Sequence, residues 1–283
     1  MNVCGKRNVR KETQMKTKYL RMATVVAVVC CAAAAVRGQD AGQQAAKPQM
    51  MAKDADPDWE VVTVKLADPN ARTAGFNVHG HEIAIERKTV QAMLIYGYGV
   101  HEKQLRGVPD WARTEVWDAQ GIADVQGHPD HGQMQTLVRK LLSERFGLVL
   151  RKEPREMEAY ALTVAKGGPK MEKSTGDPNG PSNESDNENG GQTTMRVQNF
   201  SMSELTAILT GLFLDRPAVD RTGLKGRYNF QLKWTWDATR ETAPDAPPAL
   251  VTALQEQLGL KLEPVKAPVE TLIVEKIERP GAN

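Results

Sequence analysis

The chain has 283 residues, which is enough for one large domain or two domains of modest size. Hydrophobic residues make up 40% of it and aromatic residues 5%, an ordinary composition for a soluble globular protein. The first 38 residues hold eight of the 37 basic residues and one of the 35 acidic ones. The remainder therefore carries 29 basic and 34 acidic residues, and a net charge of about −5 gives no electrostatic reason to expect nucleic acid as a partner.

The N-terminus is predicted to be a signal peptide that covers residues 1–38. A basic segment precedes an uninterrupted apolar run at 22–36, which is shorter than the roughly 20 residues that a membrane-spanning helix needs. We expect cleavage before Gln39, and therefore a periplasmic or extracellular protein that contacts the membrane only if this segment stays uncleaved as an anchor. Its three cysteines are the only ones in the chain, so the mature protein has neither a disulfide nor a thiol nucleophile: Cys4, Cys30 and Cys31.

A disordered tether rich in Ala, Gln and Pro is predicted at 39–58, and a first α+β unit at 59–165. Alternating and β-branched stretches predict its strands, and apolar periodicity predicts two helices. Thr89 caps the first helix, and Gly147 ends the second with a left-handed residue. The predicted elements are a strand at 59–66, a strand or hairpin at 76–85, a helix from 90 to 96, an extended turn at 105–111, a strand at 115–123, a helix at 134–146, and a hairpin of strands at 148–150 and 160–164.

Residues 166–194 contain hardly any apolar side chain and are predicted to be a flexible linker, because they bury too little surface to offset their ordering entropy. A second α+β unit follows at 195–283. Ser201 caps its first helix, and Glu204 completes a capping box three residues later. The predicted elements are a strand at 195–200, a helix at 202–213, an extended segment at 217–220, a turn at 222–226, a strand at 228–236, a helix at 249–258 that stops at Gly259, and strands at 260–262 and 271–274.

The two units repeat one another at an offset of 112 residues, the distance from Thr89 to Ser201. Phe146-Gly147 corresponds to Leu258-Gly259 at this offset, and Trp117-Asp118 lies close to where Tyr228-Asn229 recurs. The predicted fold class is α+β, with two β-α-β-β-α-β-β repeats whose small sheets are each covered on one face by helices. A single intertwined sheet built from both copies is the alternative.

Four motifs spread over both units carry a family resemblance: FGL at 146–148, YALTVAKGGPK at 160–170, DRPAVDRTGLKGRY at 215–228 and ALQEQLGLKL at 253–262. They resemble the soil-associated bacterial protein family, a domain of unknown function abundant in acidobacteria-type genomes. The resemblance covers residues 59–283, nearly the whole mature chain. It implies an exported protein with no established activity.

Each unit is also similar in its pattern of elements to the short N-terminal domain of secretins and TonB-dependent receptors. Those domains are protein-contact modules of the periplasm. This similarity implies an interaction module by analogy of pattern alone.

The histidines of the first unit are the candidate metal ligands: His79, His81, His128 and His131. His79 and His81 share one face if their segment is a strand, and a carboxylate such as Glu82 or Asp130 would complete a zinc site. Against this, the chain contains no HExxH motif and the second unit has no histidine at the matching places. A G-x-S-x-G nucleophile motif is also absent, and we expect no cofactor.

The turn between 215 and 228 is the candidate binding surface: Arg216, Asp220, Arg221, Arg227 and Tyr228. An ion-pair network among Asp215, Arg216, Asp220 and Arg221 that only fixes the turn is the structural alternative. Trp234 and Trp236 share one strand face, where they are expected in the core, although a sugar platform stays open for them.

The sequence therefore favours an exported, non-catalytic binding module of the cell envelope. Its partner is expected to be another envelope protein or a cell-wall component, engaged through a sheet edge or through the turn at 216–227. The alternatives are a metal-dependent hydrolase that uses the histidine-rich first unit, and a sensor of a small ligand.

Overall fold

The computed structural model describes residues 49–178, 180, 182–189, 191–235 and 247–281. The predicted signal peptide, the tether up to residue 48, the three cysteines and Trp236 lie outside the described residues. The described chain is a mixed α/β structure with small sheets, and its strands form three sheets of four strands each.

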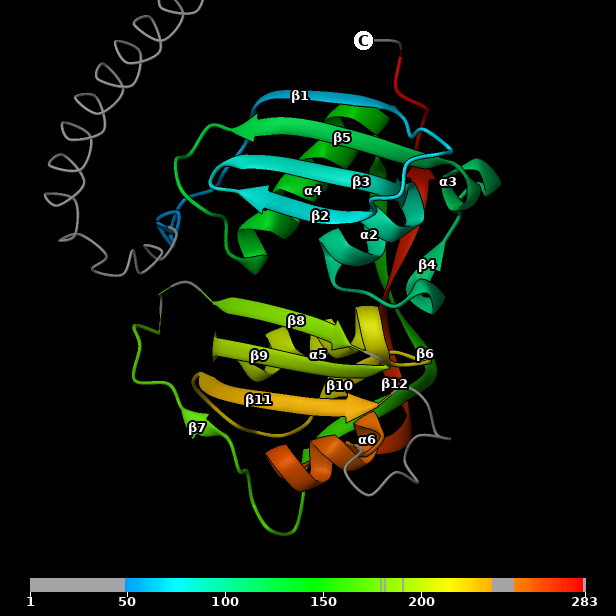
Figure 1. The fold of residues 1–283 in the computed structure, drawn as a ribbon. Helices are drawn as coiled ribbons and strands as arrows, with labels where there is room; N and C mark the ends of the chain where they lie inside the picture. The colour runs from blue at the N-terminus through cyan, green and yellow to red at the C-terminus, as the bar shows by residue number, and fades with distance from the viewer. Residues whose placement is uncertain (1–48, 179, 181, 190, 236–246, 282–283) are drawn as a thin grey trace, which may run out of the picture. The chain divides into compact units, whose positions relative to one another are not determined.

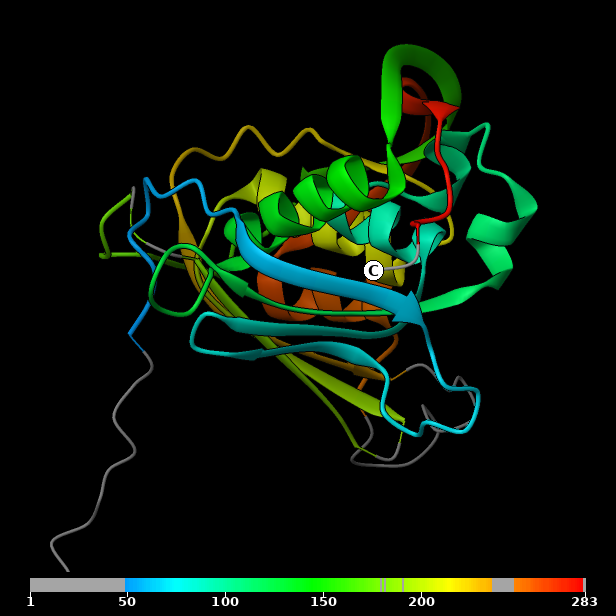
Figure 2. The same cartoon turned by 90° about the horizontal axis from the view of Figure 1, so that it is seen from above.

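The first sheet has the strand order β1-β5-β3-β2 and is antiparallel throughout. Its members are β1 (Trp59–Leu66), β2 (Gly75–His79), β3 (Glu82–Thr89) and β5 (Val116–Ala123). Helices α2 (Val90–Tyr98) and α4 (His131–Phe146) cover one face of it, as Figure 2 shows. Alternate residues such as Val62, Ile83 and Ile85 are buried against these helices, while their neighbours point to the opposite face.

A second sheet has the strand order β7-β11-β9-β8, and its members come from later in the chain. They are β7 (Glu172–Lys173), β8 (Asn183–Asn189), β9 (Gln192–Phe200) and β11 (Tyr228–Thr235). The helical segments of this half are α5 (Met202–Ile208), η2 (Leu209–Phe213), α6 (Leu250–Ala253) and η4 (Leu254–Leu258). Trp234 is fully buried in its core and packs edge-on against Phe213, which rules it out as an exposed sugar platform.

A third sheet, ordered β10-β6-β12-β4, combines strands from both halves of the chain. Two long strands, β6 (Val149–Val164) and β12 (Leu260–Lys276), pair antiparallel along almost their whole length. The short β4 (Leu105–Arg106) adds in parallel to β12, and the short β10 (Ala218–Asp220) adds in parallel to β6. Figure 1 shows β6 and β12 running between the other two sheets.

The hairpin predicted at 148–150 with 160–164 is wrong, and the two separate strands predicted at 260–262 and 271–274 are one strand. Each pair of segments belongs to one continuous strand, and the partner of that strand lies about a hundred residues away along the chain. The middle of β6 is rich in charge and resembles a turn in sequence. In the structure its residues alternate across a two-stranded ribbon, and β12 buries Ala267, Val269 and Thr271 on one side while Lys266 and Glu270 stay exposed.

The prediction of a flexible linker at 166–194 is also wrong in part. Strand β8 lies in this segment and pairs antiparallel with β9 from Asn183 to Asn189, and β7 pairs with β11. The hydrogen bonds between paired strands are made by backbone groups. A strand can therefore form here although the segment lacks the apolar side chains on which the strand predictions were based. The extended turn predicted at 105–111 is replaced by β4 and the start of the short helix α3 (Asp110–Thr114), after the turn η1 (Glu102–Gln104).

The predicted helix caps at Thr89, Ser201, Gly147 and Gly259 are confirmed. The Thr89 hydroxyl accepts from the Ala92 backbone, and Ser201 and Glu204 form a reciprocal capping box. Gly147 and Gly259 are both left-handed, with φ of 58° and 67°. Helix α4 begins earlier than predicted, at His131, because Asp130 caps it and pairs with Gln133 in a further capping box.

Arg87 and Asn199 are the two non-glycine residues with positive φ in the described part of the chain, at 50° and 60°. Each lies at a register shift near the end of its strand, two residues before a helix cap. The backbone N–H of Arg87 donates to Asp118 Oδ1 at 3.0 Å, and that of Asn199 donates to Asn229 Oδ1 at 2.9 Å. A side-chain oxygen on the neighbouring strand thus stabilises the same uncommon positive-φ conformation at both residues. The oxygen belongs to a carboxylate at Arg87 and to an amide at Asn199.

Candidate functional site

The four candidate metal ligands lie in different surroundings. His79 ends β2 on the exposed side of the first sheet, and His81 lies in the following turn, where Nδ1 is 3.1 Å from the Ala123 carbonyl oxygen. His128 Nδ1 lies 2.9 Å from the carbonyl of Pro129, and His131 is the first residue of α4. Among the described residues, no group of three or more His, Cys, Asp or Glu side chains is arranged to hold a metal ion.

The candidate binding residues of the turn have separate roles. Arg216 pairs with Asp215 at 2.9 Å, and its guanidinium lies 4.9 Å from the centre of the Tyr160 ring. Asp220 accepts from the Thr222 backbone at 2.9 Å and from its hydroxyl at 2.8 Å, and the Arg221 side chain is exposed.

Arg227 and Tyr228 face the second half instead of the solvent. Arg227 Nη1 donates to Glu204 Oε2 at 2.9 Å and to the Asn199 carbonyl, and Tyr228 is buried with its hydroxyl on the Lys225 carbonyl at 3.2 Å. The ion-pair network expected to fix the turn is present only in part: Arg216 pairs with Asp215, whereas Asp220 accepts hydrogen bonds from Thr222.

A pocket of about 150 Å³, here called the β2 pocket, lies beside the edge strand of the first sheet. Strand β2 supplies Phe76 and Val78, α2 supplies Tyr96, and α4 supplies His131 and Met134. The loop before α4 and Ser182, which precedes β8, complete its walls. The pocket thus joins residues from both halves of the chain.

Aromatic rings line the inner part of the β2 pocket. The rings of Phe76 and Tyr96 stack with their centres 4.2 Å apart, and Tyr96 meets His131 edge-on at 5.5 Å. The ring of Phe200 lies 6.4 Å beyond His131. This continuous run of rings offers flat apolar surface together with one imidazole and one phenol.

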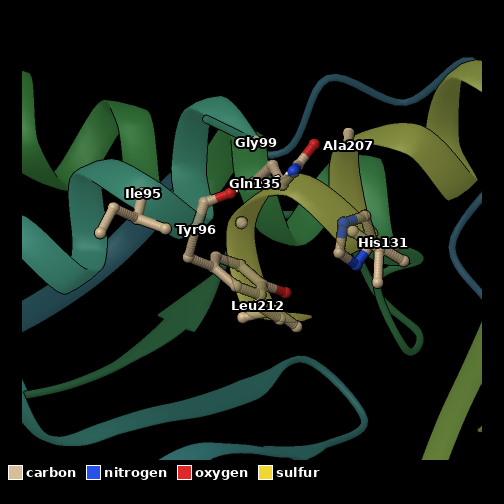
Figure 3. Close-up of a pocket in the computed structure, with 9 residues that line it drawn as sticks. Ile95, Tyr96, Gly99, His131, Gln135, Ala207 and Leu212 are labelled. Atoms are coloured by element: carbon tan, nitrogen blue, oxygen red, sulfur yellow. Dashed lines mark hydrogen bonds between the residues drawn. The ribbon is translucent and has the colours of Figure 1, made fainter. Parts of the chain in front are cut away.

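A second, much smaller cavity of about 10 Å³ shares Tyr96 and His131 with the β2 pocket and has room for about one water molecule. Figure 3 shows its walls, which come from α2, α4, α5 and η2. Gly99 closes it at a point where an added Cβ would lie 3.1 Å from the Ala207 Cβ. The helices of the two halves therefore approach closely here, and the β2 pocket ends against this contact.

The surroundings of His131 favour its neutral form. Burial lowers its pKa below the ordinary value, although the carboxylates of Glu204 and Asp130 favour the charged form. Both carboxylates already have partners: Glu204 accepts from Ser182 Oγ at 3.1 Å and from Arg227, and Asp130 accepts from Lys53 Nζ at 3.0 Å. Sequence reasoning placed Glu204 only in a capping box, because its approach to His131 depends on tertiary contacts.

Strand β2 also presents unpaired backbone groups next to the pocket. It pairs with β3 through the two-residue turn that follows His79, and residues flanking such a turn form a hydrogen-bonded pair. Phe76 and Val78, which alternate with the bonded positions, therefore direct their N–H and C=O groups to the open edge. No backbone bond from Phe76 or Val78 to a further strand occurs within the described ranges.

A family model described as a protein of unknown function, DUF3738, matches residues 91–277. The chain belongs to the DUF3738 family. The match begins in α2 and ends just after β12, so the DUF3738 region includes strands of all three sheets. No curated protein and no solved structure gives a significant match to the chain. None of the described helices of this DUF3738 member is both long and apolar enough to cross a membrane.

Proposed function

We propose that this DUF3738 protein is an exported, non-catalytic binding module that captures an extended peptide segment of an envelope protein along β2. The observation that carries the proposal is the open edge of β2 directly beside the β2 pocket. Backbone pairing along an edge strand supplies affinity, and a pocket for alternate side chains supplies specificity.

The size and lining of the β2 pocket indicate which side chain it takes. A cavity of about 150 Å³ accommodates a ring the size of benzene. The walls of Phe76, Tyr96 and His131 offer ring faces and edges to such a group. The bound segment is therefore an extended strand with an aromatic side chain that enters the pocket.

We further propose that the chain consists of two copies of one unit. Residues with the same structural role recur at the offset of 112: the positive-φ residues Arg87 and Asn199, the helix caps Thr89 and Ser201, and the left-handed Gly147 and Gly259. The first and second sheets also have corresponding strand orders, β5-β3-β2 and β11-β9-β8. The β2 pocket would then lie where the two copies meet.

The proposal of export rests on the sequence of residues 1–38. The proposed membership of the soil-associated, acidobacteria-type group rests on the motifs of both units. The similarity to secretin and TonB-receptor modules supports a role in protein contact. No cluster of described residues supports the metal-dependent hydrolase, and it is not part of the proposal.

The proposal is tested by crosslinking in cells from a photoreactive residue at Asn77, whose side chain lies on the exposed face between Phe76 and Val78. Mass spectrometry should identify an extended segment with an aromatic residue. Val78→Pro removes one free backbone donor at an edge position that tolerates proline, and it should weaken capture about five- to tenfold. Val78→Thr keeps the donor and a similar shape, and Arg221→Ala alters the other candidate surface, so both should leave capture unchanged.

Two results would contradict this function. One is equal capture by Val78→Pro and Val78→Thr, which would show that the backbone edge takes no part. The other is loss of capture in Arg221→Ala alone, which would move the binding surface to the turn at 216–227.

A further inference from the structure

The face of the first sheet that the helices leave uncovered has a hollow of about 440 Å³, a volume within the usual range of small-ligand sites. We call it the outer-face hollow. It is formed by Asn77 and His79 of β2, Glu82 and Ala84 of β3, and Gln120 and Ile122 of β5.

Strand register explains why the sheet is hollowed at this point. Asn77 pairs with Ala84, and Ala84 pairs with Gln120, so these three side chains form one row across the sheet. The methyl group of Ala84 is flanked by the two longer amides, and along its own strand by Glu82 and Glu86. A small residue surrounded by four long ones leaves a depression.

The lining of the hollow is polar and close to neutral. Gln120 and Asn77 each carry an amide that both donates and accepts, and Glu82 accepts only. Glu82 lies directly across from His79, whose ring donates or accepts. In the part of the chain described here, the side chains of Gln120, Glu82 and His79 make no hydrogen bond to another protein group, so they are available to a ligand.

An apolar strip borders these polar groups. Ile122 lies across from Glu82 in the next row of the sheet, and Val61 of β1 lies across from Ile122 with 51% of its surface exposed. Together with Ala84, these side chains give the hollow an apolar floor and one apolar side. A ligand with hydrogen-bonding groups around an apolar face would complement this lining.

We propose that the outer-face hollow is a binding site for a neutral saccharide. Sugar hydroxyls can donate to and accept from the Gln120 amide, and the C–H face of the ring packs on Ala84 and Ile122. Asn77 Nδ2 already donates to Glu86 Oε2 at 2.7 Å, which leaves Asn77 Oδ1 to accept from a sugar hydroxyl. An anion is a poor fit because the hollow contains the Glu82 carboxylate and has neither a lysine nor an arginine in its lining.

The hollow is independent of the β2 pocket. Successive residues of a strand point to opposite faces, so Asn77 and His79 face the hollow while Phe76 and Val78 face the pocket. The saccharide proposal therefore does not depend on peptide capture, and the two sites can be occupied together.

The test titrates the full exported chain with chitotetraose and, separately, with maltotetraose, and follows the backbone amides of β2, β3 and β5 by NMR. We expect one of these neutral probes to shift these amides selectively. Ala84→Phe fills the depression on an exposed face and should abolish the shifts, and Gln120→Ala should weaken binding about five- to tenfold through the loss of its hydrogen bonds. Thr63→Ala changes the neighbour of Gln120 on β1, outside the lining, and should bind as the unchanged protein does.

Peptide capture through β2 should persist in Ala84→Phe, so the two proposals fail separately. The saccharide site would be overturned if neither probe shifts these amides at about 10 mM, a concentration that exceeds a millimolar Kd tenfold. Equal binding by Ala84→Phe and the unchanged protein would overturn it as well, since the sugar would then lie elsewhere.

Discussion

The two left-handed helix ends allow the cost of backbone strain to be separated from the cost of crowding. Gly147 and Gly259 have nearly the same φ, so alanine meets the same conformational penalty at both, about 1–2 kcal/mol. The space around them differs. A Cβ on Gly147 would have Glu278 Oε2 as its nearest neighbour at 3.9 Å, whereas a Cβ on Gly259 would lie 2.1 Å from the Gly168 carbonyl oxygen.

The group that a Cβ at Gly259 would meet is the Gly168 backbone carbonyl, and this carbonyl cannot easily move away. The Ala165 N–H donates to the Gly259 carbonyl at 2.9 Å, and the Lys170 N–H donates to the Leu258 carbonyl at 2.9 Å. These bonds hold the loop that contains Gly168 against the helix end. Crowding of this kind adds about 1–3 kcal/mol, so Gly259→Ala should cost about 2–5 kcal/mol in total and Gly147→Ala only about 1–2 kcal/mol.

Urea unfolding of the two variants measures this difference. With an m value near 3 kcal/mol/M, Gly147→Ala should lower the midpoint by about 0.5 M and Gly259→Ala by about 1 M or more. Asparagine tolerates the left-handed region, so Gly147→Asn should recover part of the loss while Gly259→Asn should not. Equal midpoints for the two alanine variants would refute the reasoning, because the contact with Gly168 would then carry no cost.

Three further predictions concern titration, capping and the strained bulges. Burial lowers the pKa of His131, so the unfolded chain takes up a proton that the folded chain resists as the pH falls below about 6.5. Stability should therefore decline between pH 7 and pH 5, and His131→Gln should flatten this decline in urea midpoints. Ser201→Ala should lower the free energy of unfolding by about 1 kcal/mol through loss of the capping box. Asn199→Gly should cost less than Asn199→Ala in thermal unfolding, because φ is 60° there.

Each of these three has a clear contrary result. A pH dependence that is the same with and without His131 would show that its burial does not contribute. Equal stability of Ser201→Ala and the unchanged protein would mean that the bonds from Ser182 and Arg227 are enough to hold Glu204. Equal costs for Asn199→Gly and Asn199→Ala would indicate that the lost side-chain contacts matter and the backbone angle does not.

Local signals in the sequence predicted the helix ends and the mixed α/β class. Ser201 with Glu204, Thr89, and the glycines at 147 and 259 act through neighbours within a few residues, so their roles can be read without knowing the fold. The pairing of β6 with β12 could not be predicted in this way. Its partners are about a hundred residues apart, and the charged middle of β6 gives no apolar pattern on which to base a strand.

The candidate sites were predicted only in part. His131 was singled out as a metal ligand, but its relation to Tyr96, Glu204 and Phe200 depends on the meeting of α4 with the second half of the chain. The outer-face hollow was missed because it depends on register. The placing of Ala84 between Asn77 and Gln120 is a property of three paired strands and of no single segment.

The exchange of β4 and β10 between the two halves has a consequence for biosynthesis. The Gln104 amide beside β4 donates to the Glu270 carbonyl across a separation of 166 residues, and such long-range contacts slow folding. Neither half has its full set of strands until β12 has been made. We expect a nascent chain to stay incompletely folded until β12 has been made, and a chain truncated before residue 260 to be degraded.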